Sequence, residues 1–260
     1  MAEILDVTGD DHEAGVARAS EALRSARLVV MPTDTVYGVA ADAFDPAATA
    51  RIFDAKDRSR THPLPVLVRS QKQLPALTPL VSDVLDRLVA AYWPGPLTIV
   101  VPAQPQLRWD LGRNDGTVAV RMPLDDVALA VIRSVGPLAV TSANRSGREP
   151  GPTAADAHEQ LGDAVDIYLD GGPRDGGLPS TIVDVTRREP HVLREGVVPA
   201  TEVLAVARGE LDPFAGPLPE DRRAADGTTG GPGAGSGAGG SDPDVGPDIG
   251  HQGDSGDREG

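Results

Sequence analysis

An apolar run passes directly into a polar turn at residues 28–38, whose sequence is LVVMPTDTVYG. The apolar residues at 28–31 predict a buried strand, which Pro32 ends. The turn that follows offers hydroxyls, a carboxylate and a phenol. This set suits a small zwitterion, because an ammonium group needs oxygen acceptors and a carboxylate needs donors. A turn that satisfies its own hydroxyl groups fits the same pattern equally well.

Helical and strand patterns alternate on both sides of this segment, up to about residue 210. A helix start is indicated at Asp45-Pro46, where an N-cap residue precedes proline. Some predicted strands are followed by a helix and others by another strand. This mixture predicts an α/β sheet with antiparallel parts. The predicted helices cover 11–27, 45–56, 82–93, 125–135, 153–161 and 199–208; the predicted strands cover 28–31, 65–68, 97–101, 117–122, 138–140, 167–169, 181–185 and 191–194.

The composition changes near residue 210. Residues 211–260 include 14 glycines, 10 acidic and 3 basic residues, and Phe214 is their only aromatic residue. Such a segment cannot bury enough apolar surface to offset the entropy lost on ordering. We therefore expect one catalytic domain over 1–210 and a disordered, glycine-rich acidic tail over 211–260.

The composition also excludes several classes of site. The chain has no cysteine, which excludes disulfides and thiolate chemistry, and its five histidines are scattered, so no zinc site is expected. No apolar run approaches the roughly 20 residues of a membrane span, and the N-terminus lacks the basic start of a signal peptide. The net charge of −15 disfavours unspecific attraction to nucleic acid but allows a local basic cleft. We expect a cytoplasmic protein without membrane contact.

Two further loops carry candidate ligand-binding groups. Lys56, Arg58 and Arg60 lie where a predicted helix ends, in a loop bounded by Pro63. A single cation at this place would be explained by the negative end of the helix dipole. Three cations within five residues favour a phosphate site instead, because lysine and arginine both bind phosphate. Residues 141–147, TSANRSG, offer hydroxyls and an amide for a ribose, a phosphate or a metal-bound water, or form only a polar turn. Ligands of open α/β sheets bind outside the carboxyl ends of strands, so we expect these loops to share one cavity.

Together these loops resemble a known family, the YrdC-type threonylcarbamoyl-AMP synthases. Seven motifs occur in the family's order over about residues 12–205, and chance does not readily produce such a series. The motifs are 32–38 (PTDTVYG), 56–64 (Lys56-x-Arg58 with Pro63-Leu64), 93–98 (WPGPLT), 120–123 (VRxP), 142–147 (SANxSG), 180–184 (STIVD) and 193–196 (LRxG).

The resemblance implies a fold and a reaction. The fold would be a twisted, open, mixed α/β sheet flanked by helices around a large cleft. The reaction would be that of a nucleotidyltransferase: the amine of L-threonine and bicarbonate form a carbamate, whose oxygen attacks the α-phosphorus of ATP. Pyrophosphate then leaves with Mg²⁺. The product would pass to a tRNA threonylcarbamoyl transferase complex, which modifies the adenosine beside the anticodon.

Residue roles also follow from the resemblance. We expect Lys56 and Arg58 at the surface of the cleft. The implied catalytic residues are Lys56, Arg58, Ser142 and Asn144. The implied threonine contacts are Thr35, Arg121, Ser142 and Ser180, with Arg121 as the partner of the carboxylate. The implied ATP contacts are Lys56, Arg58, His62, Thr117, Asn144, Thr153 and Arg194, and no protein ligand to a metal is implied.

The sequence also departs from the family pattern in three places. The loop at 145–153 is one residue longer than usual, and His62 stands where the family often has asparagine. Some members carry a second folded domain after a linker, whereas this chain has its glycine-rich tail there, as in the single-domain form.

Two other functions are compatible with the sequence. Its basic side chains suit the backbone of RNA, which would make the chain a binding module; the acidic total argues against this as the main role. A fold can also host a different small substrate, which would make the chain a paralogue without synthase activity. The intact Lys56-x-Arg58 and Ser142-x-Asn144 pairs argue for the synthase.

Overall fold

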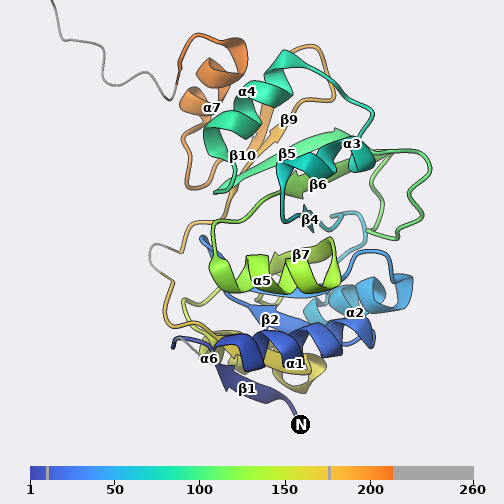
Figure 1. The fold of residues 1–260 in the computed structure, drawn as a ribbon, viewed down its shortest axis with the longest axis vertical. Helices are drawn as coiled ribbons and strands as arrows, with labels where there is room; N and C mark the ends of the chain where they lie inside the picture. The colour runs from blue at the N-terminus through green and yellow to red at the C-terminus, as the bar shows by residue number, and fades with distance from the viewer. Residues whose placement is uncertain (10–11, 175–176, 213–260) are drawn as a thin grey trace, which may run out of the picture. The chain divides into compact units, whose positions relative to one another are not determined.

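The computed structural model describes residues 1–9, 12–174 and 177–212. From residue 213 onward the predicted tail lies outside this description, as does Asp11 at the start of a predicted helix. The elements from β1 to α7 belong to one compact unit (Figure 1). Within the described part, no helix has the length and apolar character to cross a membrane.

The helices begin where the sequence places capping residues. Side-chain oxygens of Asp45, Ser82, Asp125 and Thr153 each accept a hydrogen bond from a backbone N–H of the first helical turn, which stabilises a helix start. Four predicted helix starts are thereby confirmed. The helices are α1 His12–Arg24, α2 Pro46–Lys56, α3 Leu74–Leu77, α4 Asp83–Tyr92, α5 Asp126–Val135, α6 Ala154–Leu161 and α7 Ala200–Arg208, with 3₁₀ turns η1 Gln71–Gln73 and η2 Gly162–Ala164.

In the part of the chain that the structure describes, ten strands form one open, mixed sheet in the order β1-β8-β2-β3-β7-β4-β6-β5-β9-β10. For example, β2 runs parallel to β8 and antiparallel to β3. The predicted α/β sheet with antiparallel parts is confirmed. The strands are β1 Glu3–Asp6, β2 Val29–Met31, β3 Gly38–Asp42, β4 Val66–Leu67, β5 Leu97–Pro102, β6 Thr117–Arg121, β7 Leu138–Ser142, β8 Ile167–Asp170, β9 Thr181–Asp184 and β10 His191–Arg194.

Strand β3 carries no local strand signal in the sequence, although it lies near the middle of the sheet. Its residues are Gly-Val-Ala-Ala-Asp, which are mostly small and have little preference for strands. The segment becomes a strand because β2 and β7 pair with its two edges. Tertiary pairing therefore overrides local preference here.

Two pairs of helices pack against each other beside the sheet (Figure 1). Helices α1 and α5 pack together beside β2 and β8, where Leu23 and Ile132 share an apolar cluster with Met31 and Ile167. Helices α4 and α7 lie together near β9 and β10, and the Arg87 side chain of α4 donates to the Ala207 carbonyl of α7 at 2.7 Å.

Side chains alternate between the two faces of β4, β6, β5 and β9. One set consists of cross-strand neighbours that point into the larger apolar core: Val66, Val120, Ile99 and Val183. A second set adjoins these residues in the chain and borders a cavity: Leu67, Arg121, Thr98 and Ile182. The alternation follows from the two-residue period of a strand. One face of this half-sheet is thus core, and the other is the floor of a cavity.

Candidate active site

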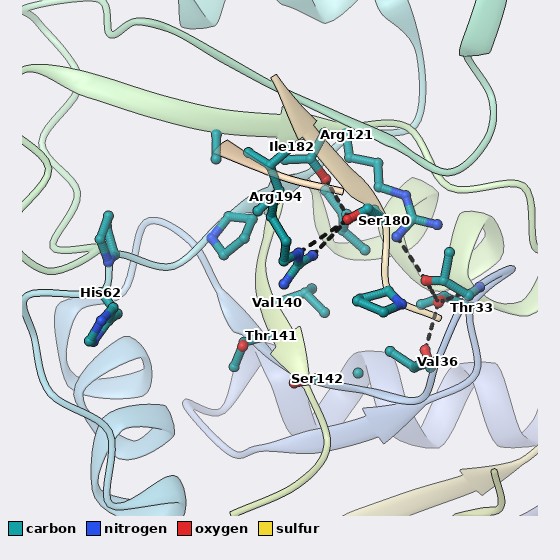
Figure 2. A pocket seen from close by; sticks show the side chains of 18 of the residues that line it. Thr33, Val36, His62, Arg121, Val140, Thr141, Ser142, Ser180, Ile182 and Arg194 are labelled. Carbon is teal, nitrogen blue, oxygen red and sulfur yellow. Dashed lines mark hydrogen bonds between the residues drawn. The ribbon is translucent and has the colours of Figure 1, made fainter. Parts of the chain in front are cut away.

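The cavity has a volume of about 380 Å³, within the range of small-molecule sites. It covers one face of the sheet, and the carboxyl ends of three strands, β6, β7 and β10, reach it through Arg121, Ser142 and Arg194. The expectation of one shared cavity holds for the turn at 33–36, the loop at 58–63 and Ser142. Its walls are Thr33, Thr35, Val36, Gly38, Arg58, His62, Pro63, Pro65, Leu67, Thr98, Val100, Ala119, Arg121, Val140, Thr141, Ser142, Pro179, Ser180, Ile182, Leu193 and Arg194 (Figure 2).

One end of the cavity is built around the buried Arg121 guanidinium group. Its Nη1 donates to the Thr35 hydroxyl at 3.0 Å, and its Nε donates to the Gly95 carbonyl at 2.9 Å. Its Nη2 contacts a carboxylate oxygen of Asp34 at 2.5 Å. Burial lowers the pKa of Arg121, and the carboxylate of Asp34 opposes that shift. This end therefore presents a guanidinium group fixed by hydrogen bonds, together with hydroxyl groups, and both suit the carboxylate of an amino acid.

The turn at 33–36 both satisfies itself and lines this end. The Thr33 hydroxyl donates to the Val36 carbonyl at 2.6 Å and accepts from the Thr35 backbone N–H at 3.2 Å. The Thr35 hydroxyl lies 3.1 Å from that of Thr33 and accepts from Arg121 Nη1. The two interpretations of this turn are therefore compatible, because Thr33 closes the turn, Thr35 bonds to Arg121, and both line the cavity.

Gly95 is needed for this arrangement. Its φ is +156°, and a Cβ here would lie 2.6 Å from the Tyr92 carbonyl oxygen. A residue with a side chain would displace the carbonyl that receives Arg121 Nε. The glycine of the 93–98 motif thus serves the geometry of Arg121.

The other part of the cavity carries cations without acidic partners. Arg194 donates to the Ser180 carbonyl at 2.8 Å (Figure 2). Arg58 donates through Nε to the His62 carbonyl at 2.9 Å. Among the described residues, neither arginine forms a salt bridge. Desolvation lowers the pKa of Arg58, and the charge of Arg194 lowers it further. Such a pair of uncompensated guanidinium groups attracts a polyanion.

Ser180 is positioned by close backbone packing. A Cβ at Gly196 would lie 2.0 Å from the Pro179 carbonyl oxygen, so only glycine allows this approach. The Ser180 hydroxyl lies 2.8 Å from that of Thr98 on β5. Sequence reasoning did not assign Thr98 to the site, although it is the one hydroxyl residue in the apolar strand 97–101 and could have been found by that signal.

Lys56 is not at the cavity surface as expected, but buried with 2% exposure. Helix α2 ends here because Asp57 adopts a left-handed cap with φ of 51°, which separates the directions of Lys56 and Arg58. The ammonium nitrogen contacts the carbonyls of Ser142 and Asn144, and the Asn144 side-chain oxygen lies at 3.4 Å. Lys56 therefore braces the loop whose Ser142 lines the cavity.

The environment of Lys56 also shifts the pKa of its side chain toward neutral pH. Burial, and secondarily the charge of Arg58, lower the pKa of Lys56 to about 7. A neutral amine keeps two hydrogens for the two carbonyls, and an ammonium group has a third for Asn144. Lys56 is also one of only two lysines in the chain, the other being Lys72.

Three other predicted site residues do not line the cavity. Asn144 is buried and donates to the carbonyls of Arg145 and Arg148 at 3.0 and 2.5 Å. The Thr117 hydroxyl donates to the Asn114 carbonyl at 2.7 Å. Thr153 forms a capping box with Asp156 at the start of α6. Each of these side chains is engaged in holding local structure, and their ATP contacts remain predictions.

The cavity lining contains no carboxylate. Across the described residues, no three histidine, aspartate or glutamate side chains gather where a metal ion could bind. The described part of the chain therefore offers no cluster of acidic or histidine ligands for a resident metal ion.

These features define a class: an α/β protein whose open sheet face carries a cavity lined by hydroxyls and arginines. One arginine, Arg121, is paired with a carboxylate, and two others, Arg58 and Arg194, have no acidic partner among the described residues. The chain belongs to the Sua5, YciO and YrdC family. The family model, described as "Telomere recombination", matches residues 21–196.

Individual relatives agree with this assignment. A Mycobacterium tuberculosis protein, provisionally named threonylcarbamoyl-AMP synthase, is 47% identical over 210 residues, which are 80% of this chain and 96% of that protein. Pyrococcus abyssi Sua5, solved in complex with L-threonine, superposes with a TM-score of 0.75 at 35% identity, covering 78% of this chain and 60% of that longer one. Escherichia coli YciO shares the fold with a TM-score of 0.72 at 24% identity, covering 78% of this chain and all of that one.

Proposed function

We propose that this chain is a threonylcarbamoyl-AMP synthase, which makes threonylcarbamoyl-AMP from L-threonine, bicarbonate and ATP and releases pyrophosphate. The observation that carries the proposal is the division of one cavity between Arg121 with its hydroxyl neighbours and the pair Arg58 and Arg194. Arg121 with its hydroxyl neighbours suits an amino-acid carboxylate, and the pair Arg58 and Arg194 suits phosphates. Relatives named for this activity, and a relative solved with L-threonine, support the same substrate.

The chemistry requires positioning more than a protein nucleophile. Threonine's unprotonated amine attacks the carbon of bicarbonate, and loss of water leaves a carbamate. A carbamate oxygen then attacks the α-phosphorus of ATP, and the bond to the β-phosphate oxygen breaks to release pyrophosphate. Holding reactants in line is worth up to about 7–11 kcal/mol. Arg58 and Arg194 would stabilise the charge that develops on the phosphate oxygens.

Other participants belong to the same proposal. Mg²⁺ would arrive bound to the phosphates of ATP, where it neutralises part of their charge. The product is an activated mixed anhydride, and a tRNA threonylcarbamoyl transferase complex would transfer its threonylcarbamoyl group to adenosine beside the anticodon. An RNA contact at the cavity is a weaker alternative, because Arg60 is already paired with Asp110 rather than facing the cavity.

The proposal predicts that pyrophosphate release from ATP requires both threonine and bicarbonate. The measurement is a coupled pyrophosphate assay in bicarbonate-depleted buffer, with each substrate added or withheld. Serine should replace threonine with a loss of about 1–2 kcal/mol in kcat/KM, because a single methyl contact is removed. Pyrophosphate release that does not respond to threonine would exclude the synthase, and salt-sensitive RNA binding without ATP turnover would favour the binding module.

A second prediction follows from Lys56. Nearby phosphates favour the ammonium form, so ATP should raise the pKa of Lys56 from about 7. The complex should therefore take up a proton at pH 8, and ATP affinity should fall as the pH rises above about 7. Carbon-13 labelling of lysine gives two side-chain signals, of which Lys72 is the internal reference. A midpoint for Lys56 that stays fixed when ATP is added would contradict the prediction.

A further inference from the structure

The orientation of Arg121 depends on a residue behind the cavity wall. Asp34 does not line the cavity, yet its carboxylate contacts Arg121 Nη2 at 2.5 Å, with the two side chains 11% and 7% exposed. The same oxygen of Asp34 accepts from the Leu124 backbone N–H at 3.0 Å, which fixes the carboxylate. Arg121 is thus held by Asp34, Thr35 and Gly95, and one N–H remains on each Nη nitrogen.

The same carboxylate also offsets the charge of Arg121. Its second oxygen is buried and has no hydrogen-bond partner among the described residues, so Arg121 is the one cation paired with this carboxylate there. Opposite charges in a desolvated site act strongly on each other. Arg58 and Arg194, in contrast, have no acidic partner among the described salt bridges. The cavity therefore has one end with a compensated cation and another with two uncompensated cations.

We propose that Asp34 is a positioning residue that determines which anion each end of the cavity accepts. By holding Arg121 and offsetting its charge, Asp34 adapts that end to a zwitterion, whose net charge is zero, and leaves the phosphates to Arg58 and Arg194. The phosphates of ATP are attracted less strongly to a cation whose charge is offset by a carboxylate than to two cations without acidic partners. This inference rests on the proposed function, since it assigns the two ends to threonine and to ATP.

The test measures threonine binding by calorimetry, without ATP or bicarbonate, in the presence and absence of pyrophosphate. In the unaltered chain, pyrophosphate should leave the Kd for threonine unchanged within about twofold, since the two anions occupy different ends. Asp34→Asn should raise the Kd for threonine about tenfold or more, because a charge-assisted bond to Arg121 is lost. In that variant pyrophosphate should raise the Kd further, because the uncompensated Arg121 now attracts it.

Two more variants make the result decisive. Asp34→Glu keeps the negative charge but displaces it. Threonine should therefore bind more weakly, while pyrophosphate should still not compete with it. This variant keeps the inference testable if Asp34→Asn does not fold. Asp166→Asn removes the partner of Arg51, at 2.9 Å and away from the cavity, and should change neither value. An unchanged Kd for threonine in both Asp34 variants, or no competition by pyrophosphate in a folded Asp34→Asn, would overturn the inference. If the unaltered chain binds no threonine, the proposed function itself fails.

Discussion

Replacing Arg58 with alanine should lower kcat/KM for ATP about 10²–10³-fold, the usual cost of removing one donor that stabilises developing charge. Arg58 lines the cavity and, among the described residues, forms no salt bridge, so its charge is available to the phosphates. Its side chain bonds only to carbonyls of its own loop, at His62 and Pro63, and these bonds can exchange for a ligand. The measurement is pyrophosphate release at varied ATP, with the melting temperature as a check on folding.

Arg60→Ala is the matched control. Arg60 lies two residues away in the same loop, but its guanidinium group pairs with Asp110 and stacks over the Phe53 ring, 4.7 Å from the centroid. It does not line the cavity. Its loss should change kcat/KM by less than about fivefold, because an exposed pair contributes at most about 1 kcal/mol. Equal losses in the two variants would show that the loop, and not the charge of Arg58, is required.

Replacing Lys56 with methionine should reduce both stability and turnover. Methionine fills a similar volume but cannot donate to the carbonyls of Ser142 and Asn144, and an unsatisfied buried acceptor costs about 1–3 kcal/mol. The melting temperature should therefore fall by about 2–4 °C for each kcal/mol lost. Turnover should fall because the braced loop supplies Ser142 to the cavity. Thermal unfolding and pyrophosphate release on the same sample measure the two effects.

Lys72→Met removes the chain's other lysine, which is exposed in η1 and away from the cavity, and should change neither quantity. A Lys56→Met variant that melts like the unaltered chain but has lost activity would mean that Lys56 acts on phosphate directly and does not brace the loop. This outcome matters because the expectation from sequence placed Lys56 beside Arg58 at the surface of the cleft, where its removal would leave the fold intact.

Local signals in the sequence were sufficient for most of the elements. Asp45, Ser82, Asp125 and Thr153 cap the helices that they predict, because capping depends on residues within one turn. Strand β2 was visible as a short apolar run, because it is buried throughout. Strand β3 was not visible, because small residues carry no strand signal and its identity depends on partners at residues 29–31 and 138–142.

The sequence by itself therefore determined most of the elements, the family and the loops that approach one cavity. Only the tertiary structure decided which face of the sheet holds that cavity, and that Lys56 turns inward while Arg58 faces the ligand. It also brought Asp34 to Arg121, a contact between residues 87 positions apart. The reason is physical: caps and periodicity act within a few residues, whereas burial, strand order and charge compensation depend on segments that meet only when the chain folds.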